Sequence, residues 1–275
     1  MDSLLSIYDK SEASKITEMI FEHVAHLTKS DVIKFPDQFI QNEDLNHLDS
    51  ALSRLISNCP VQYLIGETCF YNLTFKVNES VLIPRPETEE LVELIIKHIS
   101  ANNQVSKILD IGSGSGCIPV SIQKNCKHVE VTSVDISSSA IALAKINAKL
   151  NDTDISFKEL DFLNQDNWTS LGIYDLIVSN PPYIPDSEKL EMDKHVKEFE
   201  PSIALFVPDS NPFIFYQNIL EFSKEHLSKD GIIFLEIHEK YGNEIKAIFE
   251  SNHFQAEIKK DIFGKDRMIV ANPYR

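Results

Sequence analysis

The pattern that most restricts the fold is an alternation of short apolar runs with helix-like segments in the second part of the chain. A buried strand is predicted for KILDIG, residues 107–112, followed by a glycine-rich turn and a short helix. The strand pattern returns in EVTSVDI, DISFKELD, YDLIVSN and GIIFLEIHE. Two more strand-like runs around Gly264 predict a final hairpin that adds an antiparallel edge. This alternation predicts an α/β fold with a doubly wound, largely parallel sheet, whose ligands bind beyond the carboxyl ends of the strands.

The first part of the chain follows a helical period instead, so a domain boundary is predicted near residue 80. Two helices with apolar faces must pack against each other or other helices, which predicts a small helical bundle. The segment FYNLTFKV then alternates apolar and polar residues, which predicts a short β-hairpin. Residues 1–80 are therefore expected to form a helical domain with a hairpin linker, and residues 81–275 the α/β domain. The apolar stripes of these two helices are Ile16, Met19, Ile20, Val24 and Leu27, and Leu45, Leu48, Leu52, Leu55 and Ile56.

Charge and residue usage exclude several classes of protein. The chain has 26 Lys and Arg residues against 42 Asp and Glu residues, and its net charge of −16 disfavours binding to a phosphate backbone. No apolar run is long enough to span a bilayer and the first residues lack a signal-peptide pattern, so a cytoplasmic location is expected. The four cysteines form no C-x-x-C pair and the nine histidines no H-E-x-x-H pattern, so no metal is expected.

The turn after the first strand of the sheet is rich in glycine. A dinucleotide fingerprint would need a third glycine at position 117, where the chain has Cys117, and the Lys-Ser/Thr pair of a phosphate-binding P-loop is absent. Glycines let the backbone approach a ligand closely, although the same residues could form a tight turn without one. The predicted ligand-binding residues of this turn are Gly112, Ser113, Gly114, Ser115 and Gly116.

Two acidic residues stand at the ends of the next strands. Asp135 ends the second strand, where a carboxylate can accept hydrogen bonds from both hydroxyls of a ribose. Asp161 ends the third strand and is followed by Phe162, and the two could bind and flank an adenine. Acids at strand ends are also common turn residues, so the pairing of Asp135 with the glycine-rich turn carries more weight.

A rigid polar corner follows the fourth strand, at Asn180-Pro181-Pro182-Tyr183. Two prolines at the end of a buried strand prevent further ladder hydrogen bonds and stiffen the loop. The Asn180 side chain and the Pro181 carbonyl then offer acceptors in a fixed geometry, and Tyr183 offers a flat face. The alternative is a turn that serves rigidity alone.

Together these motifs resemble the class I S-adenosylmethionine methyltransferases that act on planar nitrogen. That class includes adenine-N6 nucleic-acid methyltransferases and glutamine-N5 methyltransferases, and the N-P-P-Y corner does not separate them. The segment 61–93, above all the run IPRPETE at residues 83–89, resembles the HemK-type glutamine N5-methyltransferases of peptide chain release factors. EPSIAL at 200–205, FLEI at 234–237 and the small helical domain are similar too. Cys69, the segment 206–213 and His238 depart from the family pattern.

The resemblance implies a seven-stranded class I sheet and methyl transfer from S-adenosylmethionine, with S-adenosylhomocysteine as product. The acceptor would be the side-chain nitrogen of the glutamine in the Gly-Gly-Gln loop of class I release factors, and the helical domain would dock this protein substrate. Asn180 and Pro181 would hold the amide, Pro182 and Tyr183 would bound the slot, and Asn180 would also contact the cofactor. Arg85 would contact substrate or cofactor, or pair with Glu87 or Glu89. The alternative is an adenine-N6 methyltransferase with the same corner, against which the charge of −16 argues.

Overall fold

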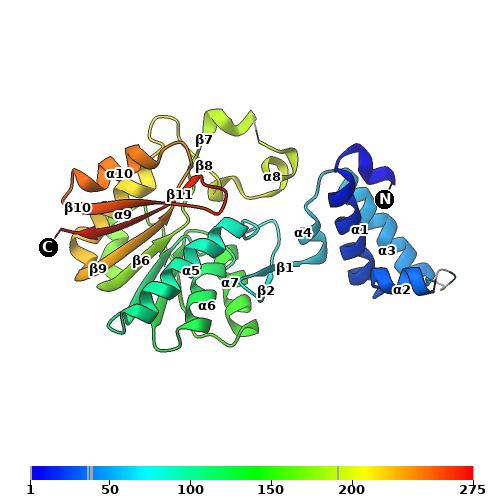
Figure 1. The fold of residues 1–275 in the computed structure, drawn as a ribbon, viewed down its shortest axis with the longest axis horizontal. Helices are drawn as coiled ribbons and strands as arrows, with labels where there is room; N and C mark the ends of the chain where they lie inside the picture. Colours follow the sequence, from blue (N-terminus) through cyan, green and yellow to red (C-terminus); the bar gives the residue numbers. More distant parts are fainter. Residues whose placement is uncertain (1, 36, 38–39, 191, 275) are drawn as a thin grey trace. The chain divides into compact units, whose positions relative to one another are not determined.

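A computed structural model describes residues 2–35, 37, 40–190 and 192–274, and the chain divides into two compact units (Figure 1). One unit comprises Met1–Glu67 with Met192–Phe199, and the other Thr68–Glu191 with Glu200–Arg275. The sequence predicts a boundary near residue 80, whereas the structure divides the chain between residues 67 and 68. The hairpin belongs to the second unit because its Phe70 and Phe75 are buried in that unit's core.

The N-terminal unit is helical and has its own core. The apolar stripes form α1 and α3 as predicted, but α1 ends at Ala25, so Leu27 lies beyond it. His26 adopts the left-handed conformation, with φ 54°, and caps the helix through its N–H. None of the helices in the described residues is long and apolar enough to cross a membrane. The helices of this unit are α1 (Lys10–Ala25), α2 (Lys29–Lys34), α3 (Asn42–Ile56), α4 (Val61–Ile65) and α8 (Lys194–Phe199), with the 3-10 helix η1 (Asp2–Ser6).

The second unit is built on a seven-stranded sheet in the order β10-β11-β9-β6-β3-β4-β5, which confirms the predicted α/β fold. Among these strands β11 alone is reversed, and it lies between β9 and β10. The final hairpin therefore supplies an antiparallel edge to the sheet, as the sequence predicts, with β10 outermost and β11 paired with β9. The strands are β3 (Lys107–Ile111), β4 (Glu130–Asp135), β5 (Ser156–Glu159), β6 (Tyr174–Ser179), β9 (Leu227–Glu236), β10 (Phe254–Lys260) and β11 (Asp266–Pro273).

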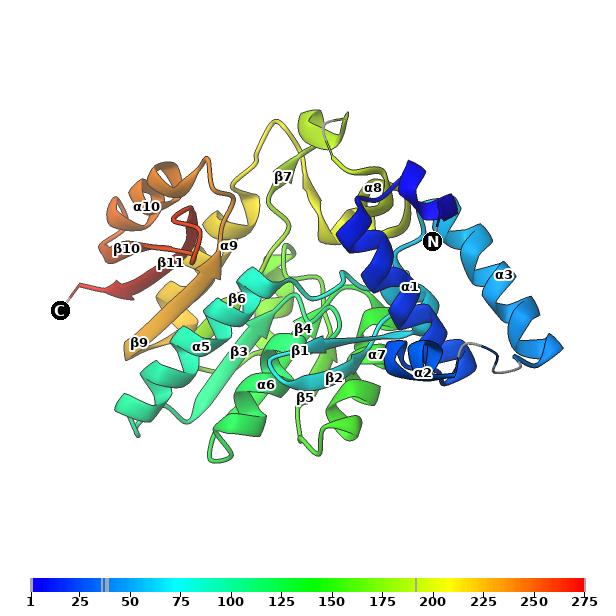
Figure 2. The same ribbon diagram turned by 45° about the vertical axis from the view of Figure 1, so that its right-hand side comes forward.

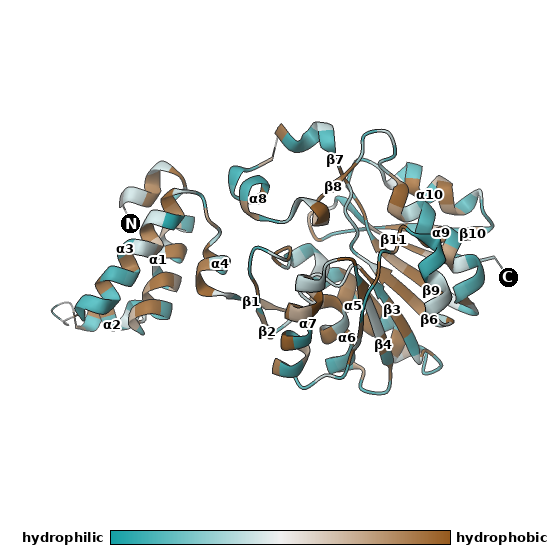
Figure 3. Ribbon diagram, turned by 180° about the vertical axis from the view of Figure 1, so that it is seen from behind, coloured by the Kyte–Doolittle hydropathy of each residue, from teal (hydrophilic) through white to brown (hydrophobic). Residues whose placement is uncertain are grey.

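Helices cover both faces of this sheet (Figures 1 and 2). One face packs against α5 (Pro86–Ala101), α6 (Cys117–Asn125) and α7 (Ser138–Leu150), and the other against α9 (Ile214–His226) and α10 (Gly242–Glu250). The strands are apolar on both faces, as parallel strands between two helical layers must be (Figure 3). In β3, for example, Ile108 points to the first layer and Leu109 to the second.

Two short sheets complete the second unit. The predicted hairpin is confirmed as β1 (Glu67–Phe70) and β2 (Leu73–Lys76), joined by two residues with φ of 49° and 59°. Near the other end of the unit, β7 (Ile184–Pro185) pairs in parallel with β8 (Phe206–Val207). This second pair ties the segment after the N-P-P-Y corner to the segment 206–213. Between them lie the 3-10 helices η3 (Asp186–Leu190) and η4 (Ser202–Ala204), and η2 (Gln165–Ser170) follows β5.

Candidate active site

The glycine-rich turn links β3 to α6 at the carboxyl end of the sheet. Gly112, Gly114 and Gly116 have φ of 88°, 50° and 80°, a region that favours glycine. A Cβ on Gly116 would lie 3.1 Å from the Ala144 Cβ, so glycine here also lets α6 approach α7. A Cβ on Gly112 would lie 3.9 Å from the backbone oxygen of Asn180, so the turn and the asparagine corner are close neighbours.

A cavity opens beside this turn and gathers most of the predicted site. It is lined by the turn, the first turn of α5, and the loops that follow β4, β5 and β6. Most of its exposed wall is apolar, which suits a nucleoside, while polar groups enter it at a few positions. The sequence-predicted residues on its wall are Arg85, Gly112, Ser113, Gly114, Ser115, Asp135, Asp161, Phe162, Asn180 and Pro182. Gly116, Pro181 and Tyr183 are not among the described residues that line it.

The Asp135 carboxylate is fixed by backbone donors on both sides. Gly114 N–H donates to Oδ2 and Ser137 N–H donates to Oδ1, each at 2.9 Å. These bonds hold the glycine turn and the start of α7 around one side chain. A carboxylate has about four lone-pair positions, so both oxygens can accept a further hydrogen bond from a ligand in the cavity.

Asp161 and Phe162 lie on the cavity wall in different ways. Asp161 Oδ1 accepts the N–H of Leu163 at 3.0 Å, which forms a tight turn after β5. The Phe162 ring is 5% exposed and packs against Trp168 and Phe222, with centroids 5.5 and 5.3 Å away. Phe162 therefore bounds the cavity from the core and is not a free stacking platform.

A chain of hydrogen bonds orients the Asn180 side chain. Asn180 Nδ2 donates to Thr88 Oγ1 at 3.1 Å, and Thr88 Oγ1 donates to Glu236 Oε2 at 2.7 Å. Because the amide NH₂ is held by Thr88, the orientation of the Asn180 Oδ1 is fixed as well. No described residue donates a hydrogen bond to that oxygen, which leaves it for a ligand.

Tyr183 belongs to the same hydrogen-bonded group, although it is not among the described residues that line the cavity. Its hydroxyl donates to Glu236 Oε1 at 3.3 Å, and its ring lies edge-on to His238 with centroids 5.9 Å apart. Burial, together with the nearby Glu236, raises the pKa of Tyr183 well above its usual value, so the hydroxyl keeps its proton and donates. Burial also raises the pKa of Glu236 to about 7.

Arg85 is paired, but not with the partners that the sequence suggests. Its Nη2 lies 2.6 Å from Glu200 Oε1, and Glu200 Oε2 accepts the N–H of Ile83 at 3.3 Å. The pairing with Glu87 or Glu89 is wrong because Arg85 precedes α5 and reaches the buried Glu200 of the EPSIAL segment. Arg85 still borders the cavity, and its side chain is 34% exposed.

Sequence reasoning missed three polar residues at this end of the sheet: Thr88, Asp110 and Glu236. Asp110 is fully buried in β3, accepts from Ser133 Oγ at 2.6 Å through Oδ2, and has no described hydrogen-bond partner at Oδ1. Burial raises its pKa to about 8. The signal for Asp110 was an acid inside an apolar run, KILDI. Thr88 and Glu236 lie in the runs IPRPETE and FLEI that resemble the family, but no local pattern pairs them, because they meet across 148 residues of chain.

The strand order, the reversed β11 and the cavity at the carboxyl edge define a class I methyltransferase fold. Two family models match the chain, the PrmC N-terminal domain over residues 3–66 and the methyltransferase small domain over residues 87–198. A crystal structure of a ribosomal protein L11 methylase from Lactobacillus delbrueckii subsp. bulgaricus has a TM-score of 0.51 and is 21% identical. The match covers 72% of this chain and 84% of that one, and it shows the fold alone.

Curated relatives define the family more closely. A release factor glutamine methyltransferase from Flavobacterium psychrophilum is 42% identical, over 99% of this chain and 96% of that protein. A second from Bacteroides thetaiotaomicron is 38% identical, over 98% of this chain and 96% of that protein. The chain belongs to the release factor glutamine methyltransferase family.

Proposed function

We propose that this enzyme methylates N5 of the glutamine in the Gly-Gly-Gln loop of class I peptide chain release factors and thereby modulates translation termination. The observation that carries the proposal is the fixed Asn180 amide, which borders the same cavity as the glycine turn and Asp135. The relatives that match nearly the whole chain are release factor glutamine methyltransferases, which supports the choice of protein substrate. A substrate that acts in translation also supports a cytoplasmic location.

S-adenosylmethionine fits the residues that line the cavity. Asp135 would accept from the ribose hydroxyls, because both its oxygens keep free lone pairs. Asp161 and the Phe162 wall would bind the adenine, and the glycine turn would lie along the rest of the molecule. When bound, the cofactor would supply an electrophilic methyl group on a sulfonium and leave as S-adenosylhomocysteine, while the methylated glutamine nitrogen would release one proton to solvent.

The corner would hold and orient the glutamine amide. An amide nitrogen is a poor nucleophile because its lone pair is delocalised into the carbonyl. Asn180 Oδ1 and the Pro181 carbonyl would each accept one amide hydrogen, which fixes the nitrogen and favours its pyramidalisation. Thr88 and Glu236 keep Asn180 in that orientation before substrate arrives. Such a reaction depends on positioning and electrostatic support more than on a strong base.

Three other residues would shape the glutamine slot. Pro182 lies on the cavity wall and would stiffen it. Tyr183 would support the corner through its bond to Glu236, next to the slot. Arg85, held by Glu200, would contact the substrate backbone or the cofactor.

The N-terminal unit would provide a second binding surface for the release factor. It has a separate apolar core, and a groove between α1 and α3 is lined by apolar residues together with His23, His47 and Arg54. A second attachment raises affinity without entering the chemistry. If residues 1–67 are deleted and the remainder keeps its fold by circular dichroism, we expect weaker methylation of intact release factor. Unchanged methylation would reject the docking role.

The direct test is mass spectrometry of a release factor after incubation with the enzyme and S-adenosylmethionine. We expect one added methyl group on the loop glutamine, and none on a factor in which that glutamine is replaced by alanine. DNA and structured RNA, incubated in parallel with tritiated cofactor, test the adenine-N6 alternative. Label in nucleic acid without label in the release factor would reverse the assignment.

A further inference from the structure

The turn between β10 and β11 exposes two adjacent large apolar side chains. Ile262 is 79% exposed and Phe263 is 74% exposed, and they occupy the tip of the hairpin at residues 261–265. Single exposed apolar residues are common on protein surfaces, whereas contiguous exposed apolar side chains mark contact sites.

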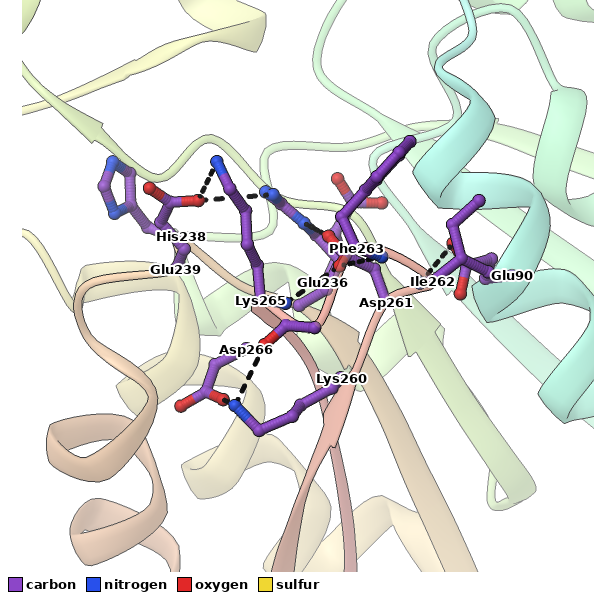
Figure 4. A network of polar contacts seen from close by, with 12 residues as sticks. Glu90, Glu236, His238, Glu239, Lys260, Asp261, Ile262, Phe263, Lys265 and Asp266 are labelled. Carbon is purple, nitrogen blue, oxygen red and sulfur yellow. Dashed lines mark hydrogen bonds and ion pairs between the residues drawn. The ribbon is translucent and has the colours of Figure 1, made fainter.

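The backbone of this tip is held rigidly (Figure 4). Asp261, itself 5% exposed, accepts the N–H groups of Phe263 and Lys265 at 3.0 and 2.9 Å through Oδ1. Its Oδ2 accepts Arg267 Nε at 3.2 Å. The N–H of Ile262 donates to Glu90 Oε1 of α5 at 3.3 Å. The chain therefore keeps two apolar side chains in water on a fixed support, although neither packs into the core.

The tip lies at the edge of the sheet that carries the candidate active site. Strand β10 runs in the same direction as β3, β4 and β6, so the turn after it lies at their carboxyl ends. Glu90, which holds the tip, is on the helix whose first turn lines the cavity.

Ion pairs connect the tip to the neighbouring loops of that edge. Lys265 Nζ lies 2.7 Å from Glu239, and Lys240 of the same loop lies 3.1 Å from Glu188 in η3. Helix η3 follows the N-P-P-Y corner and ends at Leu190, whose side chain is 85% exposed. The tip is thus part of a connected set of loops around the corner.

We propose that the Ile262–Phe263 tip is a docking surface for the protein substrate. The two tip side chains would insert into an apolar depression of the release factor, beside its glutamine loop, and this docking role rests on the proposed function. The release factor is the occupant that the position of the tip indicates, because the tip lies at the carboxyl edge that carries the asparagine corner and is linked by the ion pairs of Lys265 and Lys240 to the loops around it. A preformed tip loses little conformational freedom on binding, so its burial contributes to affinity.

The test compares a tip variant with a matched control on two substrates. The variant carries Ile262→Ser and Phe263→Ser, and the control carries Ile173→Ser. Ile173 is 61% exposed and precedes β6, at the opposite edge of the sheet. The substrates are an intact release factor and a short peptide with the Gly-Gly-Gln sequence. For the tip variant we expect KM for the intact factor to rise about tenfold or more, which corresponds to about 1.4 kcal/mol. Its kcat, and its KM for the peptide, should match those of the control.

Each other outcome overturns a stated claim. If the wild-type enzyme methylates the factor and the tip variant has an unchanged KM, the docking surface is refuted while the proposed function stands. Equal losses on factor and peptide would show an effect on the site itself and also refute docking. If the tip mediates self-association, sedimentation will give a larger mass for the wild type than for the variant, which assigns the tip to a second copy. A wild-type enzyme that does not methylate any release factor refutes both proposals.

Discussion

The two walls of the cavity are built in different ways. On the cofactor wall, backbone geometry sets the shape: three glycines with positive φ form the turn, and Asp135 is held by two backbone N–H groups. On the corner wall, side chains hold one another, since Asn180 depends on Thr88 and Thr88 on Glu236. The first wall is thus encoded within short stretches of chain, while the second needs the whole domain to be folded.

Substitutions on the two walls should therefore affect different kinetic constants. A substitution on the cofactor wall removes one contact with a bound molecule, so we expect it to change affinity. A substitution on the corner wall misplaces the reacting amide, so we expect it to change the chemical step. Variants that separate KM from kcat therefore distinguish the two walls.

The largest effect is expected for Asn180→Ala. It removes an acceptor that would hold the reacting nitrogen, so kcat should fall about 100- to 1,000-fold, a loss of about 2–4 kcal/mol of barrier lowering. Steady-state rates at saturating cofactor measure this, while calorimetry should show a much smaller loss of cofactor affinity. Asn103→Ala, in an exposed turn before β3, is the matched control and should retain full activity. Near-normal turnover of the Asn180 variant would refute its role.

Asp135→Asn tests the opposite wall. It removes the charge that would accept ribose hydroxyls, so KM for S-adenosylmethionine should rise about 10- to 100-fold, as loss of a hydrogen bond to a charged group does. The kcat at saturation should change little. Asp152→Asn removes a charge from a position whose side chain is 89% exposed and should leave both constants unchanged. A fall in kcat without a change in KM would contradict the division between the walls.

The sequence alone predicts the cofactor wall better than the corner wall. The glycine turn and Asp135 follow from patterns within a few residues, and the structure has them on the wall of one cavity. Asn180 and the prolines were identified by motif. Their supports were not, because Glu236 and Glu200 come from segments more than 100 residues away from Thr88 and Arg85. The Arg85 pairing was wrong because its guanidinium reaches Glu200, 115 residues away, instead of the acids next to it in the sequence.

A smaller effect is expected for Thr88→Val, which keeps the shape but removes the hydroxyl that links Asn180 to Glu236. Loss of one such bond leaves Asn180 present but less well oriented, so kcat should fall about tenfold. Thr88→Ser retains the hydroxyl and should restore most of the rate. If valine and serine gave equal rates, the hydrogen-bond chain would have no part in positioning.

The smallest effect is expected in the pH dependence of kcat. When Glu236 is ionised, both its oxygens accept, one from Thr88 and one from Tyr183, and its pKa is about 7. Protonation removes one acceptor, so kcat should fall about two- to threefold as pH drops from about 8 to about 6.

The stability of the protein should change with pH in the opposite direction. Burial raises the folded-state pKa above the ordinary value of 4.5, so the folded protein binds more protons and the free energy of unfolding falls as pH rises from 4.5 to about 7. Glu236→Gln mimics the protonated form, so its kcat should stay at the lower value across this pH range and its stability should no longer depend on pH there. If kcat of this variant still changed with pH as in the wild type, the titration would belong to another group.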